Sequence, residues 1–382
     1  MEYKALLDTV DALYGRYLSV LEDVTNLESP TESKEAVDAV GRYFETLARE
    51  KGWLVEKLPL ETAGDPICIT MNPDAPGAPV TFSGHIDTVQ PFGLFGDPPA
   101  RIADGKLYGP GVTDCKGGVV AAFLAMDALE RRGFTARPVK LILQTDEEVG
   151  SRISGKKTVA FMCEKAAGSV AFLNTEPCNP DCATLTRKGI WQARITVEGK
   201  ATHSAECHKG ANAIAAAALM LLELEKFKDP EGLTCNCGCI EGGTVPNAVP
   251  ARCNFTADFR FATKEQQLQA QEAVTALTEN PGIPGCRSSF HVFNARPAMV
   301  FSQANTDLLD RMNAIYVRCG MSALKTKVGT GGSDAAYTTE AGIPTVDSLG
   351  ILGNGIHSVR EFAYCDSLAE SAKRLALAAY FL

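Results

Sequence analysis

Three short apolar runs in the first half of the chain are each followed at once by histidine or acidic residues. The runs cover 79–84, 139–145 and 170–175 and are rich in valine, leucine, isoleucine and phenylalanine. Such runs predict strands that are buried on both faces of a sheet covered by helices, and hence an α/β fold. In open α/β sheets the ligand site lies beyond the carboxyl ends of the strands. The polar residues after these runs are therefore expected to meet in one crevice.

These polar residues are of types that bind divalent metals. By motif they are His85 and Asp87 in SGHIDTV, Asp114 in GPGVTDCKGG, Glu147 and Glu148 in QTDEEVGS, Glu176 in LNTEP and His357 in GNGIHS. Imidazole and carboxylate groups bind zinc at about 2.0–2.2 Å, and a carboxylate can bridge two ions about 3.5–4 Å apart. A site for two bridged metals is predicted. Each motif alone has a plainer interpretation, because a single buried histidine is more often a core residue and the paired glutamates could form a solvated loop.

Six motifs resemble, in order and spacing, the co-catalytic zinc metallopeptidase family of aminoacylase, acetylornithine deacetylase, succinyl-diaminopimelate desuccinylase and glutamate carboxypeptidase. They are SGHIDTV, GPGVTDCKGG, TDEEVGS, GKATHSA, GTGGSDAAY and GNGIHS. The resemblance covers nearly the whole chain, and the stretch from Gly331 to Asp366 is most similar to glutamate carboxypeptidase. It implies a zinc-exopeptidase-like mixed sheet flanked by helices, with an inserted ferredoxin-like α+β lid or dimerisation domain.

The resemblance also implies how the metal ligands are divided. His85, Asp114 and Glu176 would hold one metal, and Asp114, Glu148 and His357 would hold the other. Asp114 would then bridge the two ions. The expected cofactors are two Zn²⁺ ions, with Co²⁺ or Mn²⁺ as alternatives.

Two further carboxylates receive catalytic roles from the same resemblance. Asp87 would orient the imidazole of His85, which fixes its tautomer. Glu147 stands outside both ligand sets and would act as general base and acid, passing a proton from the attacking water to the leaving amine. A cis peptide bond is expected between Asp114 and Cys115. The Cys115 side chain is interpreted as filling space, because no histidine remains to activate it as a nucleophile.

The pattern of elements changes between residues 188 and 296. Alternation and helical periodicity predict the order β-α-β-β-α-β, the split ferredoxin-like arrangement, with strands at 190–198, 233–241, 252–261 and 286–293 and helices at 211–227 and 264–278. Outside this domain, helices are expected at 31–52, 116–132, 307–318 and 366–381, and strands at 324–328 and 345–348. Because His357 lies after the insertion, the catalytic domain is expected to be discontinuous, with residues 1–187 and 297–382.

Residues of the inserted domain match family positions that reach the substrate. His203 in GKATHSA is implied to stabilise the developing oxyanion, from the same subunit or from the partner in a homodimer formed through the lid. Asn247 in TVPNAVP and Arg260 in ADFRF are implied to bind substrate. A guanidinium can hold a carboxylate by two hydrogen bonds, which suits a substrate with a free α-carboxylate. The alternatives are an ion pair of Arg260 with Asp258 and an ordinary loop role for His203.

A glycine-rich turn supplies the remaining candidates for substrate binding. Gly331, Gly332 and Ser333 are implied by the resemblance to contact the substrate carboxylate through their backbone. The turn lacks the Lys-Ser/Thr ending of a phosphate loop, so that interpretation is not favoured. Arg187 and Lys188, just before the lid, are further candidates for anion binding.

Composition excludes several other classes of protein. The chain has 382 residues, a net charge of −9 and a pI near 5.2, which argues against a nucleic-acid-binding surface. No membrane span is expected, and the first residues lack the features of a signal peptide. A cytoplasmic location is expected, and most of the 13 cysteines are therefore expected to be free. Cys235, Cys237 and Cys239 alternate and are predicted to lie on one buried strand face.

The expected activity is hydrolysis of a peptide or amide bond next to a free carboxylate, similar to glutamate carboxypeptidase. The substrate would be a small peptide or an N-acyl amino acid. The alternative is an N-acyl-amino-acid deacylase of the acetylornithine or succinyl-diaminopimelate type, which would share every catalytic residue. The stretch from Glu176 to Gly189 is shorter than expected for glutamate carboxypeptidase. A non-catalytic peptide-binding scaffold is disfavoured, because the base and the full ligand set are intact.

Overall fold

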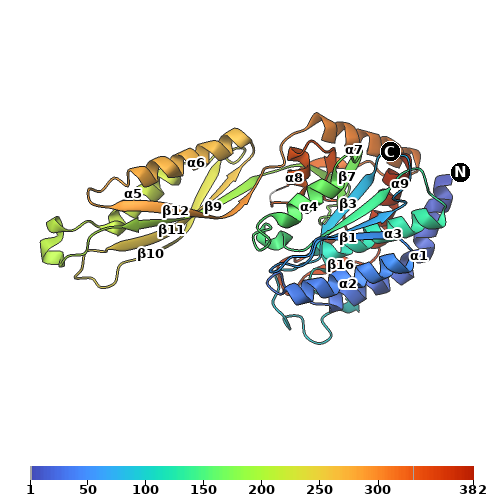
Figure 1. Cartoon of the computed structure of the whole chain (residues 1–382), viewed down its shortest axis with the longest axis horizontal. Helices are drawn as coiled ribbons and strands as arrows, with labels where there is room; N and C mark the ends of the chain where they lie inside the picture. The colour runs from blue at the N-terminus through green and yellow to red at the C-terminus, as the bar shows by residue number, and fades with distance from the viewer. Residues whose placement is uncertain (1, 330) are drawn as a thin grey trace. The chain divides into compact units, whose positions relative to one another are not determined.

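A mixed sheet in the order β1-β2-β6-β3-β7-β14 forms the centre of the larger of two units in the computed structural model (Figure 1). The structure describes residues 2–329 and 331–382. The larger unit contains residues 2–186, Phe301–Gly329 and Ser333–Leu382. The other contains Arg187–Val300 together with Gly331 and Gly332. Thr330, inside the predicted glycine-rich turn, lies outside the described residues.

Three parallel strands at the centre of the sheet carry the predicted apolar runs. The sheet consists of β1 (Leu54–Lys57), β2 (Ile67–Met71), β6 (Val139–Gln144), β3 (Val80–His85), β7 (Ala171–Asn174) and β14 (Thr345–Val346). β3 pairs with β6 and β7 in parallel, β14 extends the parallel part, and β1 and β2 are antiparallel. The predicted strands at 79–84, 139–145 and 170–175 are confirmed as β3, β6 and β7. The sheet is mixed, as expected from the family resemblance.

Helices cover both faces of this sheet, which explains why its strands are apolar on both sides. Val80 and Phe82 of β3 belong to a core cluster built with α1 (Glu2–Asn26), α2 (Lys34–Glu50), α3 (Gly117–Arg131), α7 (Gln303–Arg318) and α9 (Ser367–Phe381). Ile142 and Phe172 belong to a second cluster, built with α4 (Lys157–Ala166) and α8 (Ala335–Glu340). Burying both faces leaves the strand ends as the place where polar side chains can gather.

The second unit has the predicted split ferredoxin-like arrangement. Its elements follow the order β9 (Gly189–Glu198), α5 (Ala213–Leu224), β10 (Thr234–Gly242), β11 (Arg252–Phe261), α6 (Lys264–Glu279) and β12 (Arg287–Arg296). The strands lie in the order β10-β11-β9-β12 and every pair is antiparallel. Buried and partly exposed residues alternate along β11, and its buried face includes Phe255 and Phe259 in a core of its own.

The prediction that three cysteines share one strand face is wrong. Cys235 is buried and its Sγ lies 4.0 Å from that of Cys237, but Cys239 is exposed. The register of β10 against β11 shifts between Asn236 and Cys239, which inserts one extra residue into β10. Because side chains alternate with a period of two, a bulge of one residue moves Cys239 to the opposite face.

Short elements complete the larger unit. They are β4 (Arg101–Ala103), β5 (Lys106–Tyr108), β15 (Gly353–Asn354) and β16 (Phe362–Tyr364) in one small sheet, the pair β8 (Cys182–Arg187) and β13 (Lys325–Gly329), and the short helical segments η1 (Val112–Lys116) and η2 (Glu147–Val149). The helix predicted at 307–318 begins earlier, at Gln303, and the strand predicted at 345–348 is shorter. No helix in the described part of the chain combines the length and apolar character needed to cross a membrane.

Candidate metal centre and active site

The predicted cluster forms where the three central parallel strands end. His85 is the last residue of β3 and is the register partner of Gln144, the last residue of β6. The pair Glu147 and Glu148 begins η2, two residues after the end of β6, and Glu176 is the second residue after β7. Parallel pairing places these strand ends at the same edge of the sheet, so residues far apart in sequence become neighbours.

The carboxylate of Asp114 lies between two histidines. Its Oδ1 is 3.0 Å from Nε2 of His85, and its Oδ2 is 3.2 Å from Nε2 of His357. On the side of His357, called the outer side, its Nε2 is also 3.1 Å from Oε2 of Glu148. On the side of His85, called the inner side, Nε2 is 3.9 Å from Oε1 of Glu176. The two oxygens of one carboxylate thus face two different groups of donors, which is the arrangement a bridging ligand needs.

His357 reaches this position through an unusual backbone conformation. Its φ is 61°, in the left-handed region that residues other than glycine seldom adopt. Such conformations persist only where the surrounding structure enforces them, and they concentrate at functional sites. The side chain of His357 is 52% exposed, whereas that of Asp114 is 9% exposed, so the outer donor group is the one open to solvent.

Asp87 supports both His85 and the glutamate pair. Nδ1 of His85 lies 3.0 Å from the backbone oxygen of Asp87 and 3.5 Å from its Oδ1. A carbonyl oxygen can only accept, so Nδ1 carries a proton. Nε2 is then the nitrogen that can give its lone pair to a cation, in place of the proton it shares with Asp114. The carboxylate of Asp87 also accepts from the backbone N–H groups of Glu147 and Glu148, both at 3.2 Å, and from the hydroxyl of Thr31 at 2.8 Å.

Glu361 is a supporting residue that the sequence analysis missed. Its buried carboxylate accepts backbone N–H groups of Gly111, Thr113 and Asp114 at 3.2, 2.9 and 3.1 Å. These bonds hold the loop that presents the Asp114 side chain. Burial raises the pKa of Glu361 to about 7. A single glutamate in VREFAY carries no motif, so no signal in the sequence indicates this role.

The predicted cis bond between Asp114 and Cys115 is confirmed.

The charges of the cluster favour a bound cation. Burial and the nearby charge of Glu147 raise the pKa of Glu176 well above its usual value, and burial raises that of Glu148 to about 7. Burial opposes ionisation of Asp114, but hydrogen bonds from His357 and His85 hold its pKa below the usual range. Hydrogen bonds to Asp114 and Glu148 raise the pKa of His357 to about 10. Crowded carboxylates and imidazoles that compete for protons are the donor types that divalent zinc binds.

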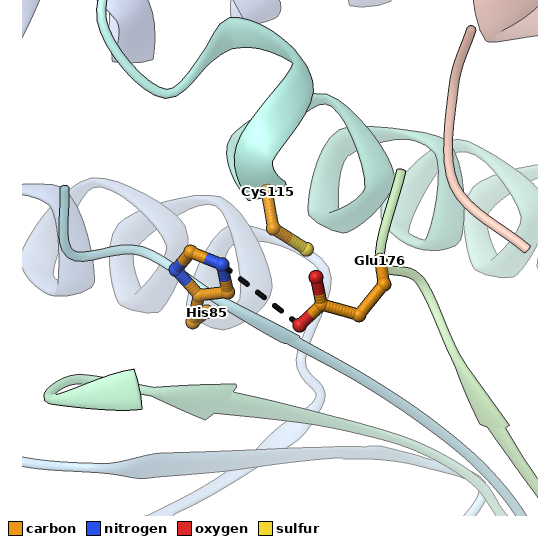
Figure 2. A group of neighbouring side chains, drawn as sticks. All are labelled: His85, Cys115 and Glu176. Atoms are coloured by element: carbon orange, nitrogen blue, oxygen red, sulfur yellow. Dashed lines mark ion pairs between the residues drawn. The ribbon is translucent and has the colours of Figure 1, made fainter. Parts of the chain in front are cut away.

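Two groups of donor atoms lie close enough to share an ion. One consists of His85, Asp114 and Glu148, and the other of His85, Cys115 and Glu176, with the donor atoms of each group all within 4.8 Å of one another. Figure 2 shows the second group, in which the imidazole, thiol and carboxylate point toward one another. The residues therefore fit a dinuclear metal centre.

The predicted residues of the lid belong to the second unit. His203 is exposed, and its Nδ1 accepts the backbone N–H of Ala205 at 3.2 Å. His203 forms a β-bridge with Ala248, and the backbone N–H of Ser204 donates to the backbone oxygen of Asn247 at 3.0 Å. The predicted oxyanion donor and the predicted substrate-binding asparagine thus lie on adjacent segments of the second unit.

Arg260 adopts the ion pair that the sequence analysis kept as an alternative. Its Nε and Nη2 donate to the two carboxylate oxygens of Asp258 at 2.8 and 3.0 Å. The amide of Gln192 also donates to Asp258, at 2.6 Å. The side chain of Arg260 is 35% exposed, so it contacts solvent while it is paired.

The remaining candidates for anion binding are distributed over the glycine-rich turn and its neighbours. Nη1 of Arg187 donates to the carbonyl oxygen of Gly331 at 3.2 Å, and an added Cβ on Gly332 would lie 2.8 Å from Arg296. Lys188 donates to two backbone oxygens of the second unit. Ser333 is buried in the larger unit, where its hydroxyl accepts the Asn174 amide at 3.0 Å.

The profile described as peptidase family M20/M25/M40 matches residues 81–380, a range that includes the whole cluster. The chain belongs to this family. The family resemblance predicted from the six motifs is therefore confirmed, as is the predicted enzyme class of peptidase or amide hydrolase. Membership does not define the substrate.

Two relatives and one solved structure illustrate the similarity. Carboxypeptidase G2 from Pseudomonas sp. (strain RS-16) is 27% identical over 346 residues, which cover 89% of this chain and 83% of that protein. A succinyl-diaminopimelate desuccinylase from Roseobacter denitrificans is 28% identical over 313 residues, covering 77% and 81%. A Bacillus subtilis protein described as a dinuclear metal binding peptidase of the M20 family has a TM-score of 0.71 at 17% identity, covering 97% and 98%.

Proposed function

We propose that this M20-family protein hydrolyses a peptide or amide bond next to a free carboxylate, with a specificity similar to that of carboxypeptidase G2. The observation that carries the proposal is the carboxylate of Asp114 between His85 and His357, with Glu147 and Glu148 on the adjoining segment. The similarity to carboxypeptidase G2 over 89% of the chain supports the choice of substrate class.

The donor set suits two divalent cations, with zinc preferred and cobalt or manganese as alternatives. We assign His85, Asp114 and Glu176 to one ion and Asp114, Glu148 and His357 to the other. When bound, the two ions would polarise the scissile carbonyl and make the attacking water more acidic. Asp87 would hold the imidazole of His85 in the tautomer that presents Nε2.

Glu147 is the proposed general base and acid. Its backbone N–H donates to Asp87, the residue is 7% exposed, and its charge acts on Glu176 and Glu148, so the carboxylate lies within the cluster. As a water adds to the carbonyl carbon, the Glu147 carboxylate takes one water proton. It returns that proton to the amine nitrogen as the C–N bond breaks, which leaves a carboxylic acid and an amine.

Residues of the second unit and the turn are proposed to recognise the substrate. His203 would stabilise the oxyanion, and Asn247 and Arg260 would bind the substrate. Gly331 and Gly332, together with Ser333 and Arg187, would contact its free carboxylate. The proposal includes a homodimer formed through the second unit and a cytoplasmic location. Sedimentation velocity of the purified protein tests the dimer, and fractionation of the source cells tests the location.

The second candidate is an N-acyl-amino-acid deacylase, and the desuccinylase relative favours it. That relative is 28% identical over 77% of the chain, close to the value for carboxypeptidase G2. The turn after Glu176 is tight, since the backbone N–H of Cys182, the first residue of β8, donates to the backbone oxygen of Asn179. Because the stretch from Glu176 to Gly189 is short, it offers few side chains that could bind a glutamate in the substrate.

One experiment separates the two candidates. The cobalt- or zinc-loaded protein is incubated with a mixed set of dipeptides, glutamyl conjugates, and acetyl and succinyl amino acids, and mass spectrometry identifies the products. We expect the peptides and glutamyl conjugates that end in a free carboxylate to be consumed first. Preferential loss of acetyl or succinyl groups would favour the deacylase instead. Metal uptake without hydrolysis of any amide would support a binding scaffold.

A further inference from the structure

Cys115 lies in the metal cluster although the sequence analysis treated it as a space-filling residue. It belongs to η1, whereas His85 ends β3 and Glu176 follows β7. All three side chains are buried, with 2%, 0% and 8% of the residue exposed for His85, Cys115 and Glu176. Figure 2 shows the sulfur directed toward the carboxylate of Glu176 and the imidazole of His85. Three elements therefore deliver three different donor types to one point.

The surroundings of the sulfur are polar. Sγ of Cys115 donates to the backbone oxygen of Thr175 at 3.1 Å and lies 3.9 Å from the hydroxyl of the same residue. A residue that only fills an apolar gap would be expected to contact carbon atoms. Gly84 brings its backbone close to the thiol, since an added Cβ there would lie 3.0 Å from the sulfur. The missing side chain at Gly84 thus leaves room for the sulfur of Cys115, which contacts polar groups of Thr175.

The distances between the donors fit one cation after small adjustments. Zinc binds thiolate at about 2.3 Å and imidazole or carboxylate at about 2.0–2.2 Å, so donors in a tetrahedral site lie about 3.4–3.7 Å apart. His85 and Glu176 are already 3.9 Å apart, and the sulfur lies within 4.8 Å of both donor atoms. Shifts smaller than about 1 Å, which a side-chain rotation supplies, would bring the three donors onto one ion.

We propose that Cys115 is a metal donor, so that His85, Cys115 and Glu176 together bind one thiophilic divalent cation such as Zn²⁺ or Cd²⁺. The proposal rests on the proposed function for the ligands His85 and Glu176, and it adds a thiolate as the third ligand. When the ion binds, the S–H bond breaks, its proton leaves to solvent, and a bond forms between sulfur and metal. The hydrogen bond from the thiol to Thr175 is lost in exchange.

The proposal gives the two metal positions different properties. With Asp114 the inner position would have four protein donors and the outer position three. Zinc in catalytic sites can expand to five ligands, so the inner ion would keep a place for the carbonyl or the water. The outer position uses Glu148 and His357, and the half-exposed imidazole leaves it accessible to substrate. A thiolate favours soft cations over hard ones, so the inner position should select zinc or cadmium over manganese, while the outer position should not.

Absorption spectra of the cobalt-loaded protein test this directly. We expect a near-ultraviolet thiolate-to-cobalt charge-transfer band in the wild-type protein and its loss in Cys115→Ser. The matched control is Cys319→Ser, which removes a buried cysteine of the same unit outside the cluster and should keep the band. We also expect the affinity for Cd²⁺, measured by titration, to fall at least tenfold in Cys115→Ser while that for Mn²⁺ changes less than tenfold.

A second measurement needs no variant. X-ray absorption of the wild-type protein loaded with zinc should show a sulfur scatterer at about 2.3 Å in addition to nitrogen and oxygen at about 2.0–2.1 Å. Two bound metals without any sulfur scatterer or charge-transfer band would overturn the role of Cys115 and leave the proposed function standing. A band that persists in Cys115→Ser would also overturn it. Failure to bind any divalent metal would overturn both proposals.

Discussion

The two units hold their candidate functional residues in opposite ways. In the larger unit Asp87, Asp114 and Glu176 are buried, and Asp87 is fixed by hydrogen bonds to backbone groups. In the second unit His203 and Asn247 are exposed. Groups that act on the reacting atoms must be held in place before the substrate arrives, whereas groups that recognise a substrate must remain accessible to it. The difference is consistent with the proposed division, in which the first set carries out the chemistry and the second recognises the substrate.

The electrostatic cost of burying charged groups also differs between the two units. Several carboxylates share a buried space in the larger unit, and burial raises the pKa of Glu148 and Glu176. Such crowding is unfavourable without cations. The lid candidates carry no comparable cost, since Arg260 pairs with Asp258 at the surface of its strand. Removal of metal should therefore affect the larger unit far more than the second unit.

Metal removal is expected to have the largest effect. Treatment with a chelator should reduce hydrolysis to background, and zinc or cobalt should restore it. Because a ligand at about 100–1,000 times its Kd stabilises a protein by about 3–4 kcal/mol, the melting temperature of the larger unit should also fall. Activity assays and calorimetry on the same samples measure both effects. Full activity in protein shown by elemental analysis to be metal-free would contradict the prediction.

Glu147→Gln should be the most damaging single substitution. The amide keeps the shape of the side chain but cannot accept the proton, so kcat should fall by about 10²–10⁴-fold while the metal content stays the same. Steady-state kinetics and elemental analysis provide the comparison. Glu164→Gln is the matched control, because that side chain is 72% exposed in the same unit. Turnover retained in Glu147→Gln would refute the proposed role.

Metal affinity should fall as the pH is lowered. In the metal-free protein His357 has a pKa of about 10 and Glu148 a pKa of about 7, and both must lose a proton to bind a cation. The range from about pH 8 to about pH 6 lies below the pKa of His357 throughout and crosses that of Glu148. Protons therefore compete more strongly as the pH falls, and the affinity should drop by about 10²–10³-fold. Competition titrations with a zinc indicator at each pH measure this. An affinity that does not change with pH would show that these groups are not ligands.

Asp87→Asn should weaken metal binding without abolishing it. The change removes the charge that supports His85 and replaces one of the two oxygens that accept from the backbone N–H groups of Glu147 and Glu148. Loss of a carboxylate that supports a metal ligand typically costs about 10–100-fold in metal affinity. Isothermal titration with zinc gives the value. A larger loss in kcat than in affinity would indicate that Asp87 acts mainly on the glutamate pair.

Arg260→Gln tests the second unit and should have the smallest effect. If the guanidinium binds the substrate carboxylate, KM should rise about tenfold, which corresponds to one charged hydrogen bond, with kcat nearly constant. Asp258→Asn is the control, since it removes the ion pair but keeps the arginine. It should leave KM unchanged or lower it. If Arg260→Gln and Asp258→Asn changed KM equally, the ion pair would serve only to stabilise the second unit.

Much of the fold could be predicted because its signals are local. The apolar runs of β3, β6 and β7 and the alternation of β11 reflect burial of strand faces, which neighbouring residues reveal. The long first helix α1, the edge strand β1 and its neighbour β2 were not predicted. Burial of β2 depends on β6 beside it, which no local pattern indicates. The face reached by Cys239 likewise depends on a bulge that only pairing with β11 defines.

The sequence by itself determined which residue types this protein could use: its motifs indicate the candidate metal donors, and their resemblance to a family implies a bridging carboxylate and one left for proton transfer. Only the tertiary structure decided how these groups meet. Asp114 faces His85 and His357 because distant loops converge at one sheet edge, and Glu361 and Cys115 acquire neighbours that the sequence does not reveal. The reason is physical. Residue chemistry is a local property, whereas distance, burial and charge arise only when segments far apart in the chain pack together.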